Sequence, residues 1–161
     1  MSTDARLLFS RSFDELPSGE SFRTHGRTIS EFDLTAFGAL TGDCAPQHLD
    51  RTFGESGPFG ERIAHGALVV SYALGLIPID PDRLIALRSL RDVKFKHPVQ
   101  IGDTIHVEGA IGDCTVVSDE AGLVELVARV LNERGELAAR MRIDVLWRRV
   151  SPSSPRDAGA I

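Results

Sequence analysis

The sequence predicts an α+β fold in which an antiparallel β-sheet wraps around one long central α-helix. Two patterns carry this prediction. The stretch from Arg62 to about Ile77 is apolar nearly all round, and a helix without a polar face must be enclosed by other elements. Pro78 and Pro81 end this helix, and the sequence after them alternates with the period of strands. One enclosed helix followed by a run of antiparallel strands indicates an α+β domain.

The first thirty residues are predicted to add strands at the start of the chain. A short apolar segment between Leu7 and Phe13 is interpreted as a packed edge strand that ends at Pro17. The string from Glu20 to Ile29 alternates loosely in polarity and indicates a further strand.

A helix is predicted to follow this strand, from Ser30 to Gly42. Ser30 is a favourable N-cap, and the acidic residue three positions later suits the helix dipole. Gly42 ends the helix. Its apolar residues recur at helical spacing and predict one apolar face made of Phe32, Ala36, Phe37 and Leu40.

The second half of the chain is predicted to be sheet. Strands are expected over 84–99, 104–117 and 123–131, with a hairpin turn over 132–135. The last strand has the clearest pattern, because one set of alternating residues is apolar and the other is charged. The apolar set is Leu137, Ala139, Met141, Ile143, Val145 and Trp147, and the charged set is Arg140, Arg142, Asp144 and Arg148. This alternation predicts a sheet with one buried face.

Length and composition favour a single soluble domain. The chain has 161 residues, of which 1–150 are predicted to form the domain and 151–161, rich in Pro and Ser, a disordered tail. The net charge of −5, with scattered basic residues, argues against a nucleic-acid partner. We expect a cytoplasmic protein, since no apolar run approaches a membrane span or a signal peptide. Cys44 and Cys114 have no metal-like spacing and suggest no disulfide framework.

The residues best suited to catalysis lie between Thr41 and Ser71. Asp43 and His48 stand five residues apart with Pro46 between them, a spacing that indicates an irregular loop in which both side chains face one small molecule. A Gly-rich stretch follows, and the pair His65-Gly66 stands where the apolar helix opens. Backbone N–H groups at such a helix start lack partners inside the helix.

This stretch resembles the signature of the MaoC-like dehydratases, the (R)-specific enoyl-CoA hydratases. The family pattern is roughly S/T-G-D-x-N-P-x-H-x-D, a spacer, and F-G-x-R-I-A-H-G. This chain reads TGDCAPQHLD from Thr41 to Asp50 and FGERIAHG from Phe59 to Gly66, with Ala45 where the family usually has Asn. The Ala45 exchange removes a side-chain amide that could brace the loop or bond the substrate.

The resemblance implies the hot-dog fold, a dimer, and reversible hydration of trans-2-enoyl thioesters to (R)-3-hydroxyacyl thioesters. By this resemblance Asp43 and His48 activate a water molecule, and the N–H of Gly66 holds the thioester oxygen. It implies no metal and no separate cofactor, because CoA or the phosphopantetheine of an acyl carrier protein is part of the substrate. The implied binding partner is thus an acyl-CoA or acyl-carrier-protein thioester as substrate. A second copy of the chain is implied as the other subunit of a homodimer.

Other residues of this stretch, and two other functions, are compatible with the same sequence. Ser71 is a weak candidate for substrate binding. His65 is expected to brace the loop, and Asp50 is expected to be a turn or cap acid. A hot-dog acyl-CoA thioesterase is one alternative, although such enzymes generally place an acid on or near the central helix. A non-catalytic subunit of a heterodimeric dehydratase is another, although both Asp43 and His48 are present here.

Overall fold

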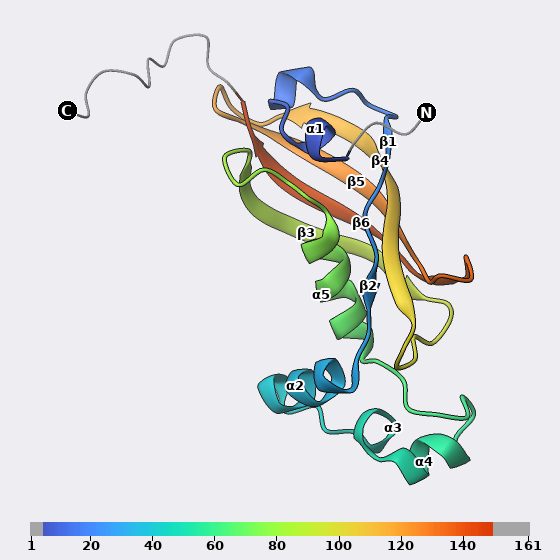
Figure 1. The fold of residues 1–161 in the computed structure, drawn as a ribbon. Coiled ribbons are helices and arrows are strands. Elements are labelled where there is room, and N and C mark those ends of the chain that lie inside the picture. Colours follow the sequence, from blue (N-terminus) through green and yellow to red (C-terminus); the bar gives the residue numbers. More distant parts are fainter. Residues whose placement is uncertain (1–4, 150–161) are drawn as a thin grey trace, which may run out of the picture.

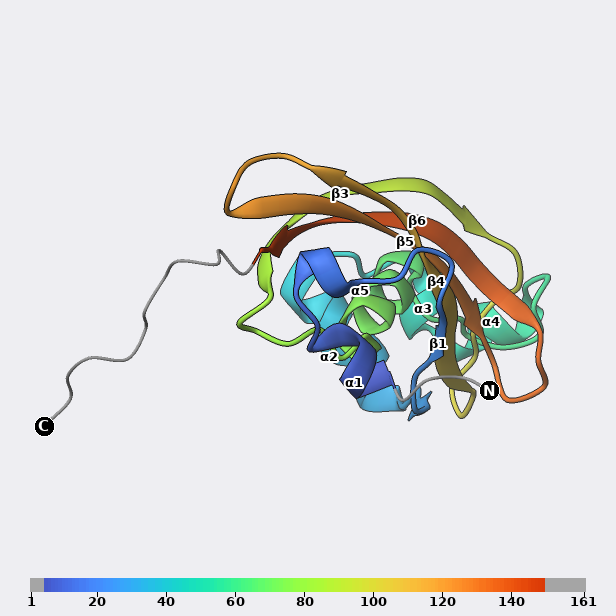
Figure 2. The same ribbon diagram turned by 90° about the horizontal axis from the view of Figure 1, so that it is seen from above.

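The computed structural model describes residues 5–149, in which a curved antiparallel sheet wraps around helix α5 (Gly66–Leu76), as Figures 1 and 2 show. The strand order is β1-β4-β5-β6-β3, and β2 pairs with β4. The strands are β1 (Ser21–Arg23), β2 (Arg27–Thr28), β3 (Leu84–Phe95), β4 (Thr104–Val116), β5 (Ala121–Leu131) and β6 (Leu137–Arg148). The α+β class and the hot-dog arrangement are confirmed. The predicted tail over 151–161 lies outside the described residues.

The concave face of the sheet carries the hydrophobic core, as the alternation in the last strand predicts. From Ala139 to Trp147, every second side chain of β6 is almost completely buried. Trp147 is fully buried, packs against Phe9 and donates its indole N–H to the carbonyl of Arg11 at 3.0 Å. A buried indole with its N–H satisfied stabilises this end of the core.

The N-terminal segment is helical, and the predicted edge strand is wrong. Helix α1 (Ala5–Phe9) and a 3-10 turn, η1 (Phe13–Glu15), lie against the end of the sheet (Figure 1). Leu8 and Phe9 are neighbours in sequence and both are fully buried. Successive side chains of a strand point to opposite faces, whereas one turn of helix can bury both. Strand β1 occupies the edge beside β4 instead.

The strand expected over 20–29 is divided into the two short strands β1 and β2. Both pair with β4, and the residues between them leave the ladder. Thr24 lies in this interruption, where its backbone N–H and its hydroxyl still bond the backbone of Val107. The loosely alternating string therefore predicted strand structure in this segment but not its interruption.

Helix α2 (Glu31–Thr41) has the predicted cap but buries a different face. Ser30 and Asp33 form a capping box, and Gly42 ends the helix with φ of 80°. The predicted apolar face is wrong, because Phe32 and Leu40 are 76% and 83% exposed. The buried face contains Leu34 and Gly38. A Cβ on Gly38 would lie 3.2 Å from Leu49, so the absence of a side chain there lets the following segment approach the helix.

Asp33 joins α2 to α5 through a buried network of hydrogen bonds. Its carboxylate accepts hydrogen bonds from the Ser30 backbone, from the hydroxyl of Tyr72 in α5, and from Arg27. The Arg27 guanidinium also lies 3.9 Å over the Tyr72 ring. Burial alone would raise the pKa of Asp33, but the hydrogen bonds outweigh it and lower the pKa to about 2.

This network makes stability depend on pH in a defined range. A carboxylate with a depressed pKa in the folded state contributes stability that is complete above its ordinary value of 3.8 and is lost as pH falls towards about 2. The shift corresponds to about 2 kcal/mol in the free energy of unfolding. We expect urea denaturation to give Asp33→Asn a lower free energy of unfolding than the parent at neutral pH. Most of that difference should be gone near pH 2, where the parent carboxylate is itself protonated.

The control for this prediction is Asp119→Asn, which changes an exposed acid in the turn between β4 and β5. Its difference from the parent should be small at both pH values. A constant deficit of Asp33→Asn across the pH range would contradict the prediction, because the lost stability would then not come from the ionised carboxylate.

Strand β3 is the open edge of the sheet, and it is irregular. All residues of β3 are exposed except Ser89 and Val93, which are half-buried. The pairing of β3 with β6 shifts register at three places. The exposed apolar side chains of this strand are Leu84, Ile85, Leu87, Leu90 and Phe95. No helix among residues 5–149 is long and apolar enough to cross a membrane.

Candidate active site

Asp43 and His48 lie at the junction between α2 and two short helices. The left-handed conformation of Gly42 turns the chain out of α2, and Asp43 follows directly. His48 lies in α3 (Pro46–Leu49), and α4 (Arg51–Ser56) comes next. The prediction of an irregular loop over this stretch is wrong. Pro46 is the first residue of α3, a position where the missing N–H costs nothing and the fixed φ suits a helix.

The segment before α5 is extended, so the central helix begins later than predicted. The structure starts the helix at Gly66 and not at Arg62. Ile63 forms a β-bridge with Gln100, and the Ala64 N–H donates to the Val99 carbonyl at 2.7 Å. These backbone groups bond the neighbouring chain instead of a helix. The apolar pattern gave the burial of this segment but not its conformation.

An ion pair and close packing fix Arg62, in the second half of the motif, beside α2 and α4. The Arg62 guanidinium bonds the Glu31 carboxylate of α2, with one contact at 2.7 Å. A Cβ on Gly54 of α4 would lie 2.7 Å from the Arg62 backbone nitrogen. Glycine at position 54 therefore allows α4 to lie directly on the strand-like segment that leads into α5.

His48 is buried, and its hydrogen bond defines its tautomer. Its Nδ1 lies 2.7 Å from the carbonyl oxygen of Ile63. A carbonyl oxygen can only accept, so Nδ1 carries the proton in the neutral ring and Nε2 carries the lone pair. Nε2 is therefore the atom of His48 that can take a proton from a ligand.

His65 braces this arrangement, as expected from the sequence. It is 1% exposed, and its Nε2 donates to the backbone carbonyl of Asp43 at 2.9 Å. Its ring stacks on that of His48 with centroids 3.8 Å apart and packs against Phe37 on the other side. Its Nδ1 is buried and finds no partner among the described residues.

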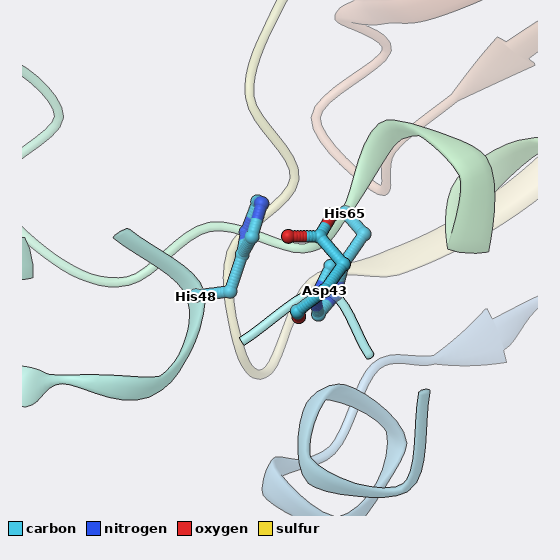
Figure 3. Close-up of side chains that lie close together, drawn as sticks. All are labelled: Asp43, His48 and His65. Atoms are coloured by element: carbon cyan, nitrogen blue, oxygen red, sulfur yellow. The ribbon is translucent and has the colours of Figure 1, made fainter. Parts of the chain in front are cut away.

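Asp43 stands beside the two imidazoles but is itself exposed. Its carboxylate accepts a long hydrogen bond, 3.4 Å, from the N–H of Ala45. One carboxylate oxygen of Asp43 and one ring nitrogen each of His48 and His65 lie within 4.8 Å of one another (Figure 3). The structure thus brings together the acid and the imidazole that the sequence singled out.

The same three side chains have the ligand types of a metal site, but their orientation fits one poorly. Two imidazoles on one ion must direct their lone pairs at a common centre. Here the ring planes of His48 and His65 differ by only 26° and lie one above the other. Lone pairs in such nearly parallel planes do not converge. The expectation that no metal is needed stays a prediction.

A cavity of about 420 Å³ opens next to His48 and the first residue of α5. Gly66 lines it and, as the first residue of the helix, carries an N–H without a partner inside the helix. Asp43 is not among the lining residues, but its carboxylate lies within 4.8 Å of a ring nitrogen of His48, which is. The rest of the lining consists of Phe59, Ile63, Ala64, Val69, Phe95, Lys96, His97, Pro98, Val99 and Ala138.

The other candidates have ordinary structural contacts. Ser71 donates its hydroxyl to the Ala67 carbonyl one turn earlier in α5, and it is not among the residues that line the cavity. Its role in substrate binding stays a prediction. Asp50 caps α4 by accepting the Phe53 N–H at 3.1 Å, which confirms it as a cap.

Sequence reasoning did not find the contribution of the sheet to the cavity. Phe95 and Ala138 come from the ends of β3 and β6, and Lys96 and His97 from the loop after β3. Alternation in a strand shows which face is apolar, but it carries no signal for which inward residue lies opposite the start of α5.

Comparison with known proteins finds a matching family model and several relatives. Residues 14–132 match the family model described as MaoC like domain. The chain is 36% identical over 108 residues to the (R)-specific enoyl-CoA hydratase of Rhodospirillum rubrum, covering 65% of this chain and 71% of that protein. It is also 36% identical over 100 residues to Protein MaoC of Klebsiella aerogenes, which covers 62% of this chain but only 30% of that longer protein.

A solved structure is also similar over most of its length. It is titled as the monoamine oxidase regulatory protein from Archaeoglobus fulgius and superposes with a TM-score of 0.81 at 34% sequence identity. The superposition covers 87% of this chain and 95% of that one. The similarity therefore extends through the whole fold and is not confined to the motif.

Proposed function

Because the chain belongs to the MaoC-like domain family, we propose that it interconverts trans-2-enoyl thioesters and (R)-3-hydroxyacyl thioesters. Relatives named as enoyl-CoA hydratase and 3-hydroxybutyryl-CoA dehydratase support a hydratase-type enzyme. The observation that carries the proposal is the group formed by Asp43 and His48, within 4.8 Å of each other, next to the cavity that Gly66 lines.

In the proposed reaction, His48 moves the proton. Water lies between the Asp43 carboxylate and Nε2 of His48. Its oxygen forms the new bond to C3 of the enoyl thioester while Nε2 takes one of its protons. The electron pair of the C2=C3 double bond passes to the thioester oxygen as an enolate. The enolate then takes the proton from His48 at C2, and the thioester carbonyl is restored.

Asp43 acts at the water and Gly66 at the thioester oxygen. The Asp43 carboxylate accepts a hydrogen bond from the second O–H of the water, whose hydrogen stays on the product hydroxyl, and stabilises the imidazolium that forms briefly on His48. The Gly66 N–H, at the positive end of α5, donates to the thioester oxygen as it becomes negative. No electrons enter or leave, so the reaction needs no redox cofactor, and CoA or a pantetheine arm belongs to the substrate.

The direct test is to mix the purified protein with crotonyl-CoA and follow the enoyl-thioester absorbance. We expect the absorbance to fall and the product to be the (R)-3-hydroxy isomer. Release of free thiol as the primary event would replace this proposal with a thioesterase. Activity that appears only after a second, related chain is added would identify a non-catalytic subunit.

We also propose that the protein is a homodimer that uses the exposed edge strand β3. An edge strand with a row of apolar side chains is normally paired or covered. Replacing Leu87, which is 49% exposed, with glutamate should therefore give a monomer in sedimentation velocity, while the parent sediments as a dimer. The control is Val117→Glu, which changes an apolar residue of similar exposure away from β3. A dimer that persists in Leu87→Glu would place the interface elsewhere.

The cytoplasmic location and the absence of a nucleic-acid partner remain predictions from composition. They are compatible with a substrate that is a soluble thioester, and the test above does not depend on either.

A further inference from the structure

Strand β3 contains a bulge just before its end. Arg91 lies opposite Arg142 and Lys94 opposite Arg140, so two residues of β3, Asp92 and Val93, face a single residue of β6. Asp92 has φ of 53°, the left-handed conformation that side chains other than glycine rarely adopt. Its carboxylate lies 3.6 Å from Arg142, which holds the bulge on the outer face of the sheet.

The bulge decides which side chain of β3 faces the cavity. In a regular strand the faces alternate, so without the extra residue Lys94 would point inward opposite Ala139, and Phe95 would point outward. With it, Phe95 lies opposite the buried Ala139 and points inward. Bulges are known to redirect side chains next to active sites. Here the redirected side chain is an aromatic ring.

The Phe95 ring lies against the first residue of α5. A Cβ on Gly66 would be 2.8 Å from Cζ of Phe95 and 3.1 Å from Cε2. A side chain at position 66 would therefore collide with the ring, and glycine leaves room for it. Phe95 also lines the cavity together with His48. The ring is therefore part of the wall beside the N–H proposed to hold the thioester oxygen.

Besides Phe95, the lining of this cavity contains two chemically different sets of residues. Ile63, Val69 and Val99 form an apolar part suited to an acyl chain. Lys96 and His97, which follow Phe95 directly, form a polar rim suited to the anionic carrier end of a thioester. Phe95 is itself 55% exposed, so its side chain can be shortened without opening the core.

From these observations we infer that Phe95, aimed by the bulge at Asp92, limits the length of acyl chain that the cavity accepts. This inference rests on the proposed function, since it concerns the substrate of the same site. Shortening the side chain removes the ring from the wall next to Gly66 and leaves room for additional methylene groups. The bulge acts through Phe95 and contacts no substrate.

The first test compares Phe95→Ala with the parent on a four-carbon and an eight-carbon trans-2-enoyl-CoA. We expect the ratio of kcat/KM, long over short, to rise about tenfold in the variant, as one or more added methylene groups find room. The matched control is Leu90→Ala, which shortens another exposed apolar residue of β3 that does not line the cavity. Its ratio should equal that of the parent.

A binding measurement separates this inference from the proposed reaction. Saturated four-carbon and eight-carbon acyl-CoAs are titrated into the parent and Phe95→Ala by calorimetry, and the ratio of Kd values should shift in the same direction. A parent without hydratase activity but with this shift would overturn the reaction and leave the inference standing. An unchanged ratio, or an equal loss for both lengths, would overturn the role of Phe95.

The role of the bulge is tested by two substitutions of Asp92. Both remove the contact with Arg142, but glycine tolerates a positive φ and valine does not. Asp92→Gly should keep the chain-length ratio of the parent, and Asp92→Val should move it towards that of Phe95→Ala. Equal ratios in the two variants would show that the backbone conformation of Asp92 does not aim Phe95.

Discussion

Replacing Asp43 with asparagine is expected to lower kcat for crotonyl-CoA hydration by about 10²–10⁴-fold, because an amide neither orients the water as a carboxylate does nor stabilises the imidazolium on His48. The carboxylate contributes little to the stability of the fold, because it is exposed and accepts one long hydrogen bond, from the Ala45 N–H. Asparagine can accept the same bond through its amide oxygen. The contact from His65 goes to the Asp43 backbone carbonyl, which the substitution leaves in place.

The measurement is the initial rate of absorbance loss at saturating crotonyl-CoA, with Asp50→Asn as the matched control. Asp50 is also an acid of the motif, but it caps α4, and asparagine is an equally good N-cap. The control should keep the activity of the parent. A similar loss in both variants would show that the motif acts through structure, and full activity in Asp43→Asn would remove Asp43 from the mechanism.

Replacing His48 with asparagine should have an effect of the same size for a different reason. The amide nitrogen of asparagine can take the position of Nδ1 and keep the hydrogen bond to the Ile63 carbonyl. The variant then lacks the lone pair of Nε2 and the ring that stacks on His65. We expect kcat to fall about 10²–10⁴-fold while KM changes little, because the lost group acts on the proton and not on the thioester.

His25→Asn is the control for this second variant, since His25 is an exposed histidine that does not line the cavity. Its kcat should stay near that of the parent. The double variant of Asp43 and His48 adds a further check. If the two residues act as a unit, it should be hardly slower than either single variant. Losses that multiply would mean that the two side chains act in separate steps.

The parts of the fold that the sequence could predict are those where one local rule decides the outcome. The alternation from Leu137 to Trp147 specified both the strand and its buried face. Ser30 and Asp33 specified a helix start through a capping box that needs only four residues. The site followed from a motif, and the structure places Asp43 and His48 within reach of each other.

The wrong predictions share one physical cause. In each case the local sequence is compatible with two structures, and tertiary packing determines which of them forms. Two rows at helical spacing run along α2, and the row with Gly38 is buried because Leu49 can approach it. Pro46 is compatible with a loop or with a first helical turn, and the contact of His48 with Ile63 accompanies the turn. The orientation of Phe95 depends on the bulge at Asp92, for which no residue type in the sequence is diagnostic.

The buried indole described above also gives the protein an internal optical reporter. Trp147 is the one tryptophan of the chain, and it is fully buried with its N–H bonded to Arg11. Its fluorescence emission therefore records whether the segment between Phe9 and Arg11 is seated on the sheet. The indole belongs to the far end of β6 and does not line the cavity. A substituted protein with unchanged emission therefore keeps its N-terminal segment in place on that end of the sheet.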